Sequence, residues 1–366
     1  MRPSALRTFL FAQAPLLLAW YTATTSHLAF DNWWAELLTF GLPIVLALSL
    51  VVLLLLPIVR PPWPYWTMPA VLFLVTMKPM RETFVPAPPP VATGHRLSVM
   101  SFNAALFNPG RPHTLDSRPE LYHRFYDHLR AGHVADVLCI QEFFHSGQAE
   151  EEMAADSILR LGGYAHFYAN PGFDPKYQGM VGAAIFSRFP VTDAGKIDLQ
   201  GSLYDGCWAD LQVDGGTVRV LNFQLRSMSI RPMWTARMPV VANVVFNLLN
   251  IHERLRTGHA ARRVDLRTIA ALLAAGPHPV IICTDLNALP YSSTYQRIKR
   301  THANAFETAG SGFGFTYRQF PWFIRIDHQF FSPRLEAVWA RTRRDIHVSD
   351  HYPIEAGYRL EGPSGR

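Results

Sequence analysis

Short apolar runs that end in a polar side chain recur along residues 95–360. Residues 97–103 alternate between apolar and polar side chains, 137–142 are apolar until the last two, and 280–287 begin with a β-branched run. Such patterns predict buried or half-buried strands. The strands deliver Asn103, Glu142 and Asp285 where the chain leaves the sheet. Because ligands collect at such strand ends, the pattern predicts a polar site at one sheet edge.

Asp285 and Asn287 are two residues apart, so both side chains are expected on the same side of their strand. A carboxylate and an amide together can orient a water molecule and bind a phosphoryl oxygen. An Asp-x-Asn triplet also makes turns, Asn103 can cap a turn, and Glu142 can be a solvated strand end. The recurrence of the pattern favours a functional site over these separate explanations.

The C-terminal part of the chain adds an acid and an imidazole. Residues 324–328 predict a strand that contains Asp327, and residues 348–351 place Asp350 beside His351. His351 alone is also compatible with a buried core histidine. Beside two carboxylates it is a candidate for moving a proton.

The remaining pattern alternates helices and strands. Residues 120–130 and 150–161 predict helices, and 208–213 and 218–223 predict a hairpin around the turn Asp214-Gly215-Gly216. Residues 252–273 predict an amphipathic helix whose arginines form a solvated face in preference to a phosphate-binding track.

Residues 238–250 are apolar but too short to cross a bilayer. Two interpretations stay open: a buried helix packed on the domain, or an interfacial segment that touches the membrane.

The first 90 residues differ from the rest. Apolar stretches lie at about 9–23, 37–59 and 63–77, and a membrane span needs about 20 residues. The pattern predicts a membrane region at 1–83 with about three transmembrane helices, a Pro-rich linker at 84–94 and a catalytic domain at 95–362. A cleaved signal peptide is the rival for the first stretch.

Charge predicts the topology of these spans. Arg2 and Arg7 precede the first span and Arg60 follows the second, while residues 24–32 contain no Lys or Arg. The positive-inside rule therefore predicts a multi-pass protein of the cell (inner) membrane with its catalytic domain outside the cytoplasm. Lys78 and Arg81 argue for the opposite orientation.

Composition excludes some classes of function. The chain carries 34 Lys and Arg against 28 Asp and Glu, a formal net charge of +6, which is far from the dense basic stripe of a dedicated nucleic-acid binder. Three cysteines without a Cys-x-x-Cys pair give neither a disulfide framework nor a zinc site.

The order of the motifs resembles the endonuclease/exonuclease/phosphatase superfamily, the DNase-I-like phosphohydrolases, and most closely its membrane-anchored bacterial members. The motifs that carry the resemblance are Ser-Phe-Asn at 101–103, Gln-Glu at 141–142, Gly-Ala-Ala-Ile-Phe-Ser-Arg-Phe-Pro at 182–190, Thr-Asp-Leu-Asn at 284–287, Gly-Phe-Gly-Phe-Thr-Tyr at 312–317, Arg-Ile-Asp-His at 325–328 and Ser-Asp-His at 349–351. The resemblance implies an α/β fold, a four-layer sandwich in which two mixed sheets lie between helices.

The resemblance also implies roles for the site residues. A hard ion, Mg²⁺ or Mn²⁺, suits carboxylate and amide oxygens, and the implied metal side consists of Glu142, Asn103 and Asp350. Asp285 would deprotonate the attacking water and Asn287 would position it. His351 would stabilise the phosphoryl group, with Asp327 holding its imidazole.

One position departs from the family. Many members have a histidine in an Asn-x-His-Leu strand, whereas this chain reads Asn222-Phe223-Gln224-Leu225. Asn222 and Gln224 are predicted to contact the substrate phosphate. A glutamine amide donates hydrogen bonds but carries neither charge nor a transferable proton.

The function predicted from the sequence is a membrane-anchored, metal-dependent phosphoesterase. Its substrate would be a lipid headgroup, a nucleotide or a nucleic acid, and the bilayer would be its other partner, with no obligate protein partner evident. The alternatives are a nuclease acting on DNA or RNA and a catalytically weak, membrane-tethered binding protein.

Overall fold

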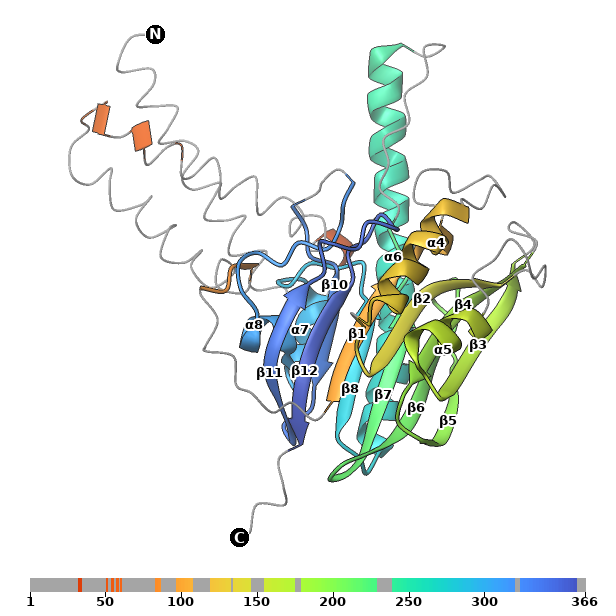
Figure 1. The fold of residues 1–366 in the computed structure, drawn as a ribbon. Coiled ribbons are helices and arrows are strands. Elements are labelled where there is room, and N and C mark those ends of the chain that lie inside the picture. Colours follow the sequence, from red (N-terminus) through yellow and green to blue (C-terminus); the bar gives the residue numbers. More distant parts are fainter. Residues whose placement is uncertain are drawn as a thin grey trace. The chain divides into compact units, whose positions relative to one another are not determined.

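The computed structural model describes residues 97–360 apart from 108–118, 133, 146–154, 175–178, 229–238 and 320–322, together with 32–34, 51, 54, 55, 57, 58, 60 and 83–86. By internal contacts the chain divides into two units, one of residues 1–83, 228–260 and 289–296 and one of residues 84–227, 261–288 and 297–366. The second unit carries two six-stranded sheets (Figure 1).

The first sheet has the strand order β11-β12-β1-β2-β4-β3. Only β1 and β2 in this sheet are parallel neighbours, and the other neighbours are antiparallel. Its strands are β1 (Leu97–Asn103), β2 (Val137–His145), β3 (His166–Asp174), β4 (Gly179–Ser187), β11 (Leu335–Thr342) and β12 (Ile354–Leu360).

The second sheet has the order β5-β6-β7-β8-β10-β9 and repeats the same plan. Its parallel pair is β7 and β8, and the remaining neighbours are antiparallel. Its strands are β5 (Val191–Ile197), β6 (Gly206–Val213), β7 (Gly216–Gln224), β8 (Val280–Asp285), β9 (Ala303–Asn304) and β10 (Asp327–Phe331).

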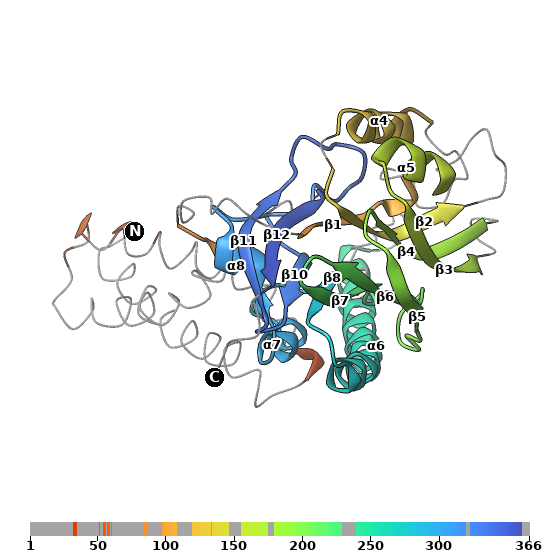
Figure 2. The same cartoon turned by 60° about the horizontal axis from the view of Figure 1, so that its bottom comes forward.

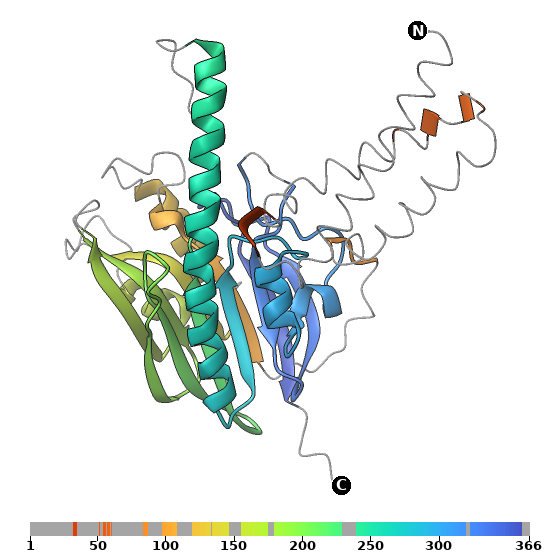
Figure 3. The same cartoon turned by 180° about the vertical axis from the view of Figure 1, so that it is seen from behind.

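Helices lie outside the sheets. Figure 2 shows α4 (Pro119–Arg130) and α5 (Ala155–Gly162) over the outer face of the first sheet. The long helix α6 (Val240–Ala275) runs with its C-terminal half along the second sheet, where Leu266 and Ile269 are buried (Figure 3). The shorter described helices are η2 (Ala105–Phe107), α7 (Ser293–Lys299) and α8 (Ala305–Ala309).

Alternation along the strands builds two apolar layers. In β1, Val99 points to the core between the sheets, while Met100 and Phe102 point to the layer under α4 and α5. Val99 meets Cys139 and Cys283 in the same core, so these two cysteines are small buried hydrophobes. Each sheet is therefore buried on both sides where it carries the predicted site strands.

Buried amides also join the two sheets. Asn222 of β7 donates to the main-chain carbonyls of Ile140 (2.9 Å) and Ala184 (2.8 Å) and accepts from Gln141 (2.7 Å). Gln329 of β10 similarly donates across the core to the carbonyl of Val99 at 3.0 Å. These bonds fix the two sheets against each other. Those of Asn222 lie near the edge where β2 and β7 end, and that of Gln329 lies farther from it.

The structure confirms the predicted strands and the hairpin β6–β7, whose turn ends with Gly215 and Gly216 at positive φ (+104° and +142°). The strand predicted from residue 324 begins only at Asp327. The apolar segment at 238–250 and the amphipathic helix predicted at 252–273 were interpreted separately. In the structure, their described residues from Val240 onward belong to one helix of 36 residues. Of the helix predicted at 150–161, residues 150–154 lie outside the described part and α5 begins at Ala155.

The predicted spans fall almost entirely outside the described residues. Within the part of the chain that the structure describes, no helix is both long enough and apolar enough to cross a bilayer. The start of the predicted linker is paired rather than free, because Val85 forms an antiparallel bridge with Gly312 and Phe84 contacts the ring of Phe313 at 4.9 Å.

Candidate active site

Strand polarity brings the predicted residues to one edge of the sandwich. Asn103 ends β1 and Glu142 lies near the end of its parallel neighbour β2, while Gln224 and Asp285 end the parallel pair β7 and β8. Asp327 begins β10, which runs antiparallel to β8, and it lies directly opposite Asp285. The same edge therefore collects side chains from both sheets.

Two amides connect two carboxylates at this edge. The Nδ2 of Asn103 donates to Asp285 Oδ2 at 2.9 Å and to Glu142 Oε1 at 3.3 Å. The Nε2 of Gln224 donates to the same two oxygens, at 3.2 Å and 2.6 Å. The four side chains form one hydrogen-bonded network that ties the first sheet to the second.

The backbone at the site is strained. Glu142 and Asn287 both have φ near +49°, a region that asparagine tolerates and glutamate rarely adopts. Glu142 sits at an irregularity in the pairing of β2 with β4, between Ile140 and Phe143. A bulge of this kind re-aims a side chain, and here it coincides with the carboxylate of the network.

Asp285 is fully buried and accepts further bonds from Asn287, whose main-chain N–H lies 2.8 Å from Oδ1 and whose Nδ2 lies 3.1 Å from Oδ2. Burial, and then the nearby charge of Asp327, raise the pKa of Asp285 to about 7, although His351 and the donated bonds oppose the shift. A carboxylate with this pKa can hold or release a proton at neutral pH.

His351 and Asp327 form a buried pair. His351 Nδ1 lies 2.8 Å from Asp327 Oδ2, and its ring meets Tyr317 edge-on at 5.2 Å between centroids. Burial alone lowers the pKa of the imidazole, but the charges of Asp327, Asp285 and Asp350 outweigh it, so the pKa is raised well above the ordinary value. The pair therefore presents a protonated imidazole with Nδ1 held by Asp327.

The acidic side chains of the site outnumber the cationic side chains that could neutralise them. The pKa of Glu142 is raised first by burial and then by the charge of Asp350, while Gln224, His351 and Asn103 lower it. Asp327 Oδ1 is buried and has no hydrogen-bond partner. Four acidic residues thus share a poorly solvated edge with one imidazole, and this donor set fits a hard divalent cation.

Among the described residues, the potential ligands that lie close together are not the set predicted to bind metal. Single ligand atoms of Asp285, Asp327 and His351 lie within 4.8 Å of one another. The hydrogen bond between Asp327 and His351 already accounts for their closeness. Asp350 Oδ1 lies 4.0 Å from His351 Nε2, which places it on the other side of the imidazole, toward Glu142.

Asn222 is the one predicted site residue that the structure keeps away from this edge. Its side chain is fully buried, and its amide is committed to Gln141 and to the carbonyls of Ile140 and Ala184. The phosphate contact predicted for Asn222 therefore stays a prediction, and the amide would have to leave these partners to make it. Asn222 and Gln224 face the same side of β7, but Asn222 lies one step deeper, between the sheets.

Supporting residues were missed in the sequence. The hydroxyl of Ser349 donates to the carbonyl of Asn103 at 2.7 Å and accepts from the N–H of His351. Arg262, predicted to be solvated, is buried, and it donates to the carbonyl of Asn287 at 2.8 Å. The only sequence signal for Arg262 was its place among the apolar positions of the helix.

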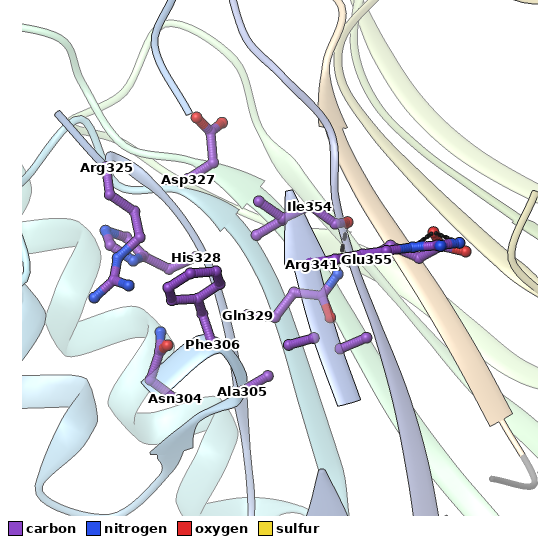
Figure 4. A pocket seen from close by; sticks show the side chains of 12 residues that line it. Asn304, Ala305, Phe306, Arg325, Asp327, His328, Gln329, Arg341, Ile354 and Glu355 are labelled. Carbon is purple, nitrogen blue, oxygen red and sulfur yellow. Dashed lines mark hydrogen bonds and ion pairs between the residues drawn. The ribbon is translucent and has the colours of Figure 1, made fainter. Parts of the chain in front are cut away.

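A cavity of about 10 Å³, large enough for about one water molecule, lies beside the start of β10. Figure 4 shows that the carboxylate of Asp327 points away from the other lining side chains, among them Arg325, Phe306 and His328. The cavity is therefore a packing defect behind the candidate active site. Asp327 lies at the rim of this cavity, and its carboxylate points toward the active site.

Comparisons with known proteins agree with this architecture. The sequence model of a family described as "Endonuclease/Exonuclease/phosphatase family" matches residues 100–351. No curated protein matches the sequence.

Many solved structures match this chain, and two of those that share its fold are endonuclease/exonuclease/phosphatase proteins from bacteria. An endonuclease/exonuclease/phosphatase from Bacteroides vulgatus has a TM-score of 0.52 at 17% identity, covering 72% of this chain and 99% of its own. An endonuclease/exonuclease/phosphatase from Beutenbergia cavernae DSM 12333 has a TM-score of 0.51 at 19% identity, covering 74% and 72%.

Proposed function

Because the chain belongs to the endonuclease/exonuclease/phosphatase family, we propose that it is a divalent-metal-dependent phosphoesterase that hydrolyses a phosphodiester or phosphomonoester by attack of water. The observation that carries the proposal is the network in which Asn103 and Gln224 join Glu142 to Asp285, beside the pair of Asp327 and His351.

Mg²⁺ or Mn²⁺ is the ion that we propose for the site. Glu142 and Asp350 would hold it. Asn103, whose Oδ1 accepts from the N–H of Ala105 at 2.9 Å and whose Nδ2 faces the carboxylates, would join them only after its amide turned its oxygen toward the ion. Bound there, the ion would supply Lewis-acid stabilisation of a phosphoryl oxygen and of the charge that develops on it. The acidic excess around Glu142 supports this assignment.

Asp285 is the proposed general base. Its pKa of about 7 lets it take a proton from water near neutral pH, and its Oδ1 is held by the main chain of Asn287. Asn287 is itself fixed, because its Nδ2 donates to the carbonyl of Leu225 at 3.0 Å. A base locked in this way orients the water that it activates.

We propose that His351 donates a hydrogen bond to the phosphoryl oxygen or a proton to the leaving oxygen. Asp327 occupies Nδ1, so Nε2 is the nitrogen that faces substrate. A protonated imidazole donates a charge-assisted hydrogen bond there, and it can return a proton to the departing oxygen. Phosphoryl transfer needs mainly such positioning and charge stabilisation.

The test is hydrolysis of bis-p-nitrophenyl phosphate by the detergent-solubilised full chain across a Mg²⁺ and Mn²⁺ titration. Glu142→Gln keeps the shape and removes the charge, so we expect a loss of about 100-fold or more, only partly restored by excess metal. Glu336→Gln, a carboxylate that is 48% exposed on β11, is the matched control and should behave as wild type. Unchanged activity of Glu142→Gln would remove Glu142 from the proposed role.

The neutral amide of Gln224 favours a second candidate, a membrane-tethered protein that binds phosphate esters and hydrolyses them slowly or not at all. Turnover of bis-p-nitrophenyl phosphate separates the two candidates. A screen of DNA, RNA, sphingomyelin and phosphoinositides then separates a nuclease from a lipid phosphodiesterase.

The proposed enzyme is anchored in the cell membrane by residues 1–83, with its catalytic domain outside the cytoplasm. The support is the apolar sequence of residues 37–59 and the placement of Arg2, Arg7 and Arg60.

A further inference from the structure

The N-terminal half of α6 presents apolar side chains to its surroundings. Residues 240–251 contain no charged residue. Val241 is 74% exposed, Leu248 62% and Leu249 64%. An exposed stripe of this kind on a helix is a surface that water solvates poorly.

The polarity of this half-helix is the reverse of that of a helix on a water-soluble domain. Val241, Val245 and Leu248 follow the spacing of one helix face and are exposed. Asn243 and Asn247 lie on the opposite face and are buried, and Asn247 Nδ2 donates to the carbonyl of Asn243 at 2.8 Å. Apolar side chains outside and amides inside are the arrangement expected of a helix surrounded by lipid.

A polar boundary follows at His252. The ring of His252 packs edge-on against Trp33 at 4.5 Å between centroids. Glu253 and Arg256 come next on the helix and form an exposed ion pair. Trp33 lies between the first two predicted spans, and tryptophan is enriched where a bilayer meets water. This contact places the polarity change of α6 beside a residue expected at the membrane surface.

The described residues of the second predicted span have the same character. Val51, Leu54 and Ile58 are helical, and they are 50%, 65% and 77% exposed. They belong to the same compact unit as residues 228–260. Within the described part of this unit, the apolar side chains of both segments are therefore left outside the protein interior.

We propose that residues 240–251 of α6 are immersed in the hydrocarbon of one leaflet, with His252 and Trp33 at its surface. Twelve helical residues extend about 18 Å, which is too short for a core of about 30 Å but sufficient to enter one leaflet. The occupant of the apolar face is lipid. This inference goes beyond the phosphoesterase function and holds whether or not the site turns over substrate.

A single labelled cysteine tests the proposal in the full chain reconstituted into phosphatidylcholine–phosphatidylglycerol vesicles. Cys139, Cys207 and Cys283 are buried, so a thiol-reactive fluorophore will select an introduced surface cysteine. Leu248→Cys carries the probe inside the proposed segment. Arg256→Cys, on the same helix beyond the boundary, is the matched control.

We expect the label at position 248 to be quenched several-fold more strongly by brominated lipid than the label at 256, and to be shielded from aqueous iodide. The label at 256 should show the opposite pattern. Iodide quenching at both positions would overturn the proposal, because the face would then be in water. Shielding of position 248 from both quenchers would also overturn it, since protein, such as the N-terminal segment of the chain, would then cover the face.

Discussion

At the scale of single residues, the site depends on side-chain amides that donate hydrogen bonds to buried carboxylates. Gln224 and Asn103 each use one NH₂ group to bridge Glu142 and Asp285, so both carboxylates keep donors although little water reaches them. A bond to an ionised acceptor contributes more than a neutral one. The sequence placed Gln224 against the substrate phosphate, and the structure shows its amide engaged with the two carboxylates.

Gln224→Ala should lower kcat/KM by roughly 10- to 100-fold, because it removes a charge-assisted bond of about 1.5–3 kcal/mol from Glu142. It should also raise the Mg²⁺ concentration needed for half-maximal activity, since Glu142 loses its 2.6 Å donor. Gln224→His supplies a donor again and should keep or raise activity, and it should add an ionisation near ~6.5. Wild-type kinetics for Gln224→Ala would show that this amide positions nothing.

His328 gives a prediction for stability against pH. It is buried with Nε2 3.1 Å from the carbonyl of Ala288, and burial, then the charge of Arg325, lower its pKa well below the ordinary value. Below about pH 6.5 the unfolded chain binds a proton that the folded chain refuses, so stability falls as the pH falls, by up to about 1.4 kcal/mol per pH unit.

His328→Gln keeps a donor for Ala288 and cannot titrate. Thermal denaturation of the full chain in detergent at pH 7.5 and 5.5 is the measurement, without added metal. Wild type should lose more stability between these values than His328→Gln. Equal losses would mean that His328 is protonated in the folded protein.

At the scale of elements, strands were predictable where apolar alternation was unbroken. The runs ending at Asn103 and Asp285 and the turn after Val213 were identified because period-2 patterns and Gly-Gly turns are local signals. The single helix α6 was not identified, because its exposed apolar half does not share the pattern of its amphipathic half. The bulge at Glu142 and the buried Arg262 depend on partners distant in sequence, which no local pattern records.

Asn222 is an example of a residue whose hydrogen bonds join strands that are distant in sequence. Its amide joins β7 to β2 and β4 by three hydrogen bonds. Asn222→Ala leaves buried partners unsatisfied at Gln141 and two carbonyls, so we expect a loss of stability on the order of 3 kcal/mol. Activity per folded molecule should remain within a few-fold of wild type. Gln212→Ala, at an exposed position of β6, is the control and should be neutral.

A large loss of stability with retained specific activity would distinguish the sheet-joining role from the phosphate contact predicted from the sequence. The reverse result, intact stability with lost activity, would return Asn222 to the substrate.

At the scale of the whole molecule, the chain combines the two-sheet fold of the endonuclease/exonuclease/phosphatase family with an apolar N-terminal region and a half-helix of inverted polarity. The half-helix and residues 1–83 belong to one compact unit, although more than 150 residues separate them in sequence. The family resemblance of residues 95–360 was enough to predict the fold of the two sheets, and it gave no information on residues 1–83. The composition of residues 1–83 predicts membrane spans, and hydropathy alone leaves residues 238–250 ambiguous between a buried helix and an interfacial segment.

The orientation of this unit in the membrane is the last prediction. Three spans that begin with Arg2 and Arg7 in the cytoplasm, and that return at Arg60, place Asp285 and His351 on the other side. Alkaline phosphatase fused after Pro90 should be active and green fluorescent protein at the same point dark, while fusions after Arg60 should give the opposite signals. Lys78 and Arg81 oppose this orientation, so reversing them to Glu should strengthen the phosphatase signal. A fluorescent, phosphatase-negative fusion after Pro90 would place the catalytic domain in the cytoplasm, with an even number of spans or an inverted first one.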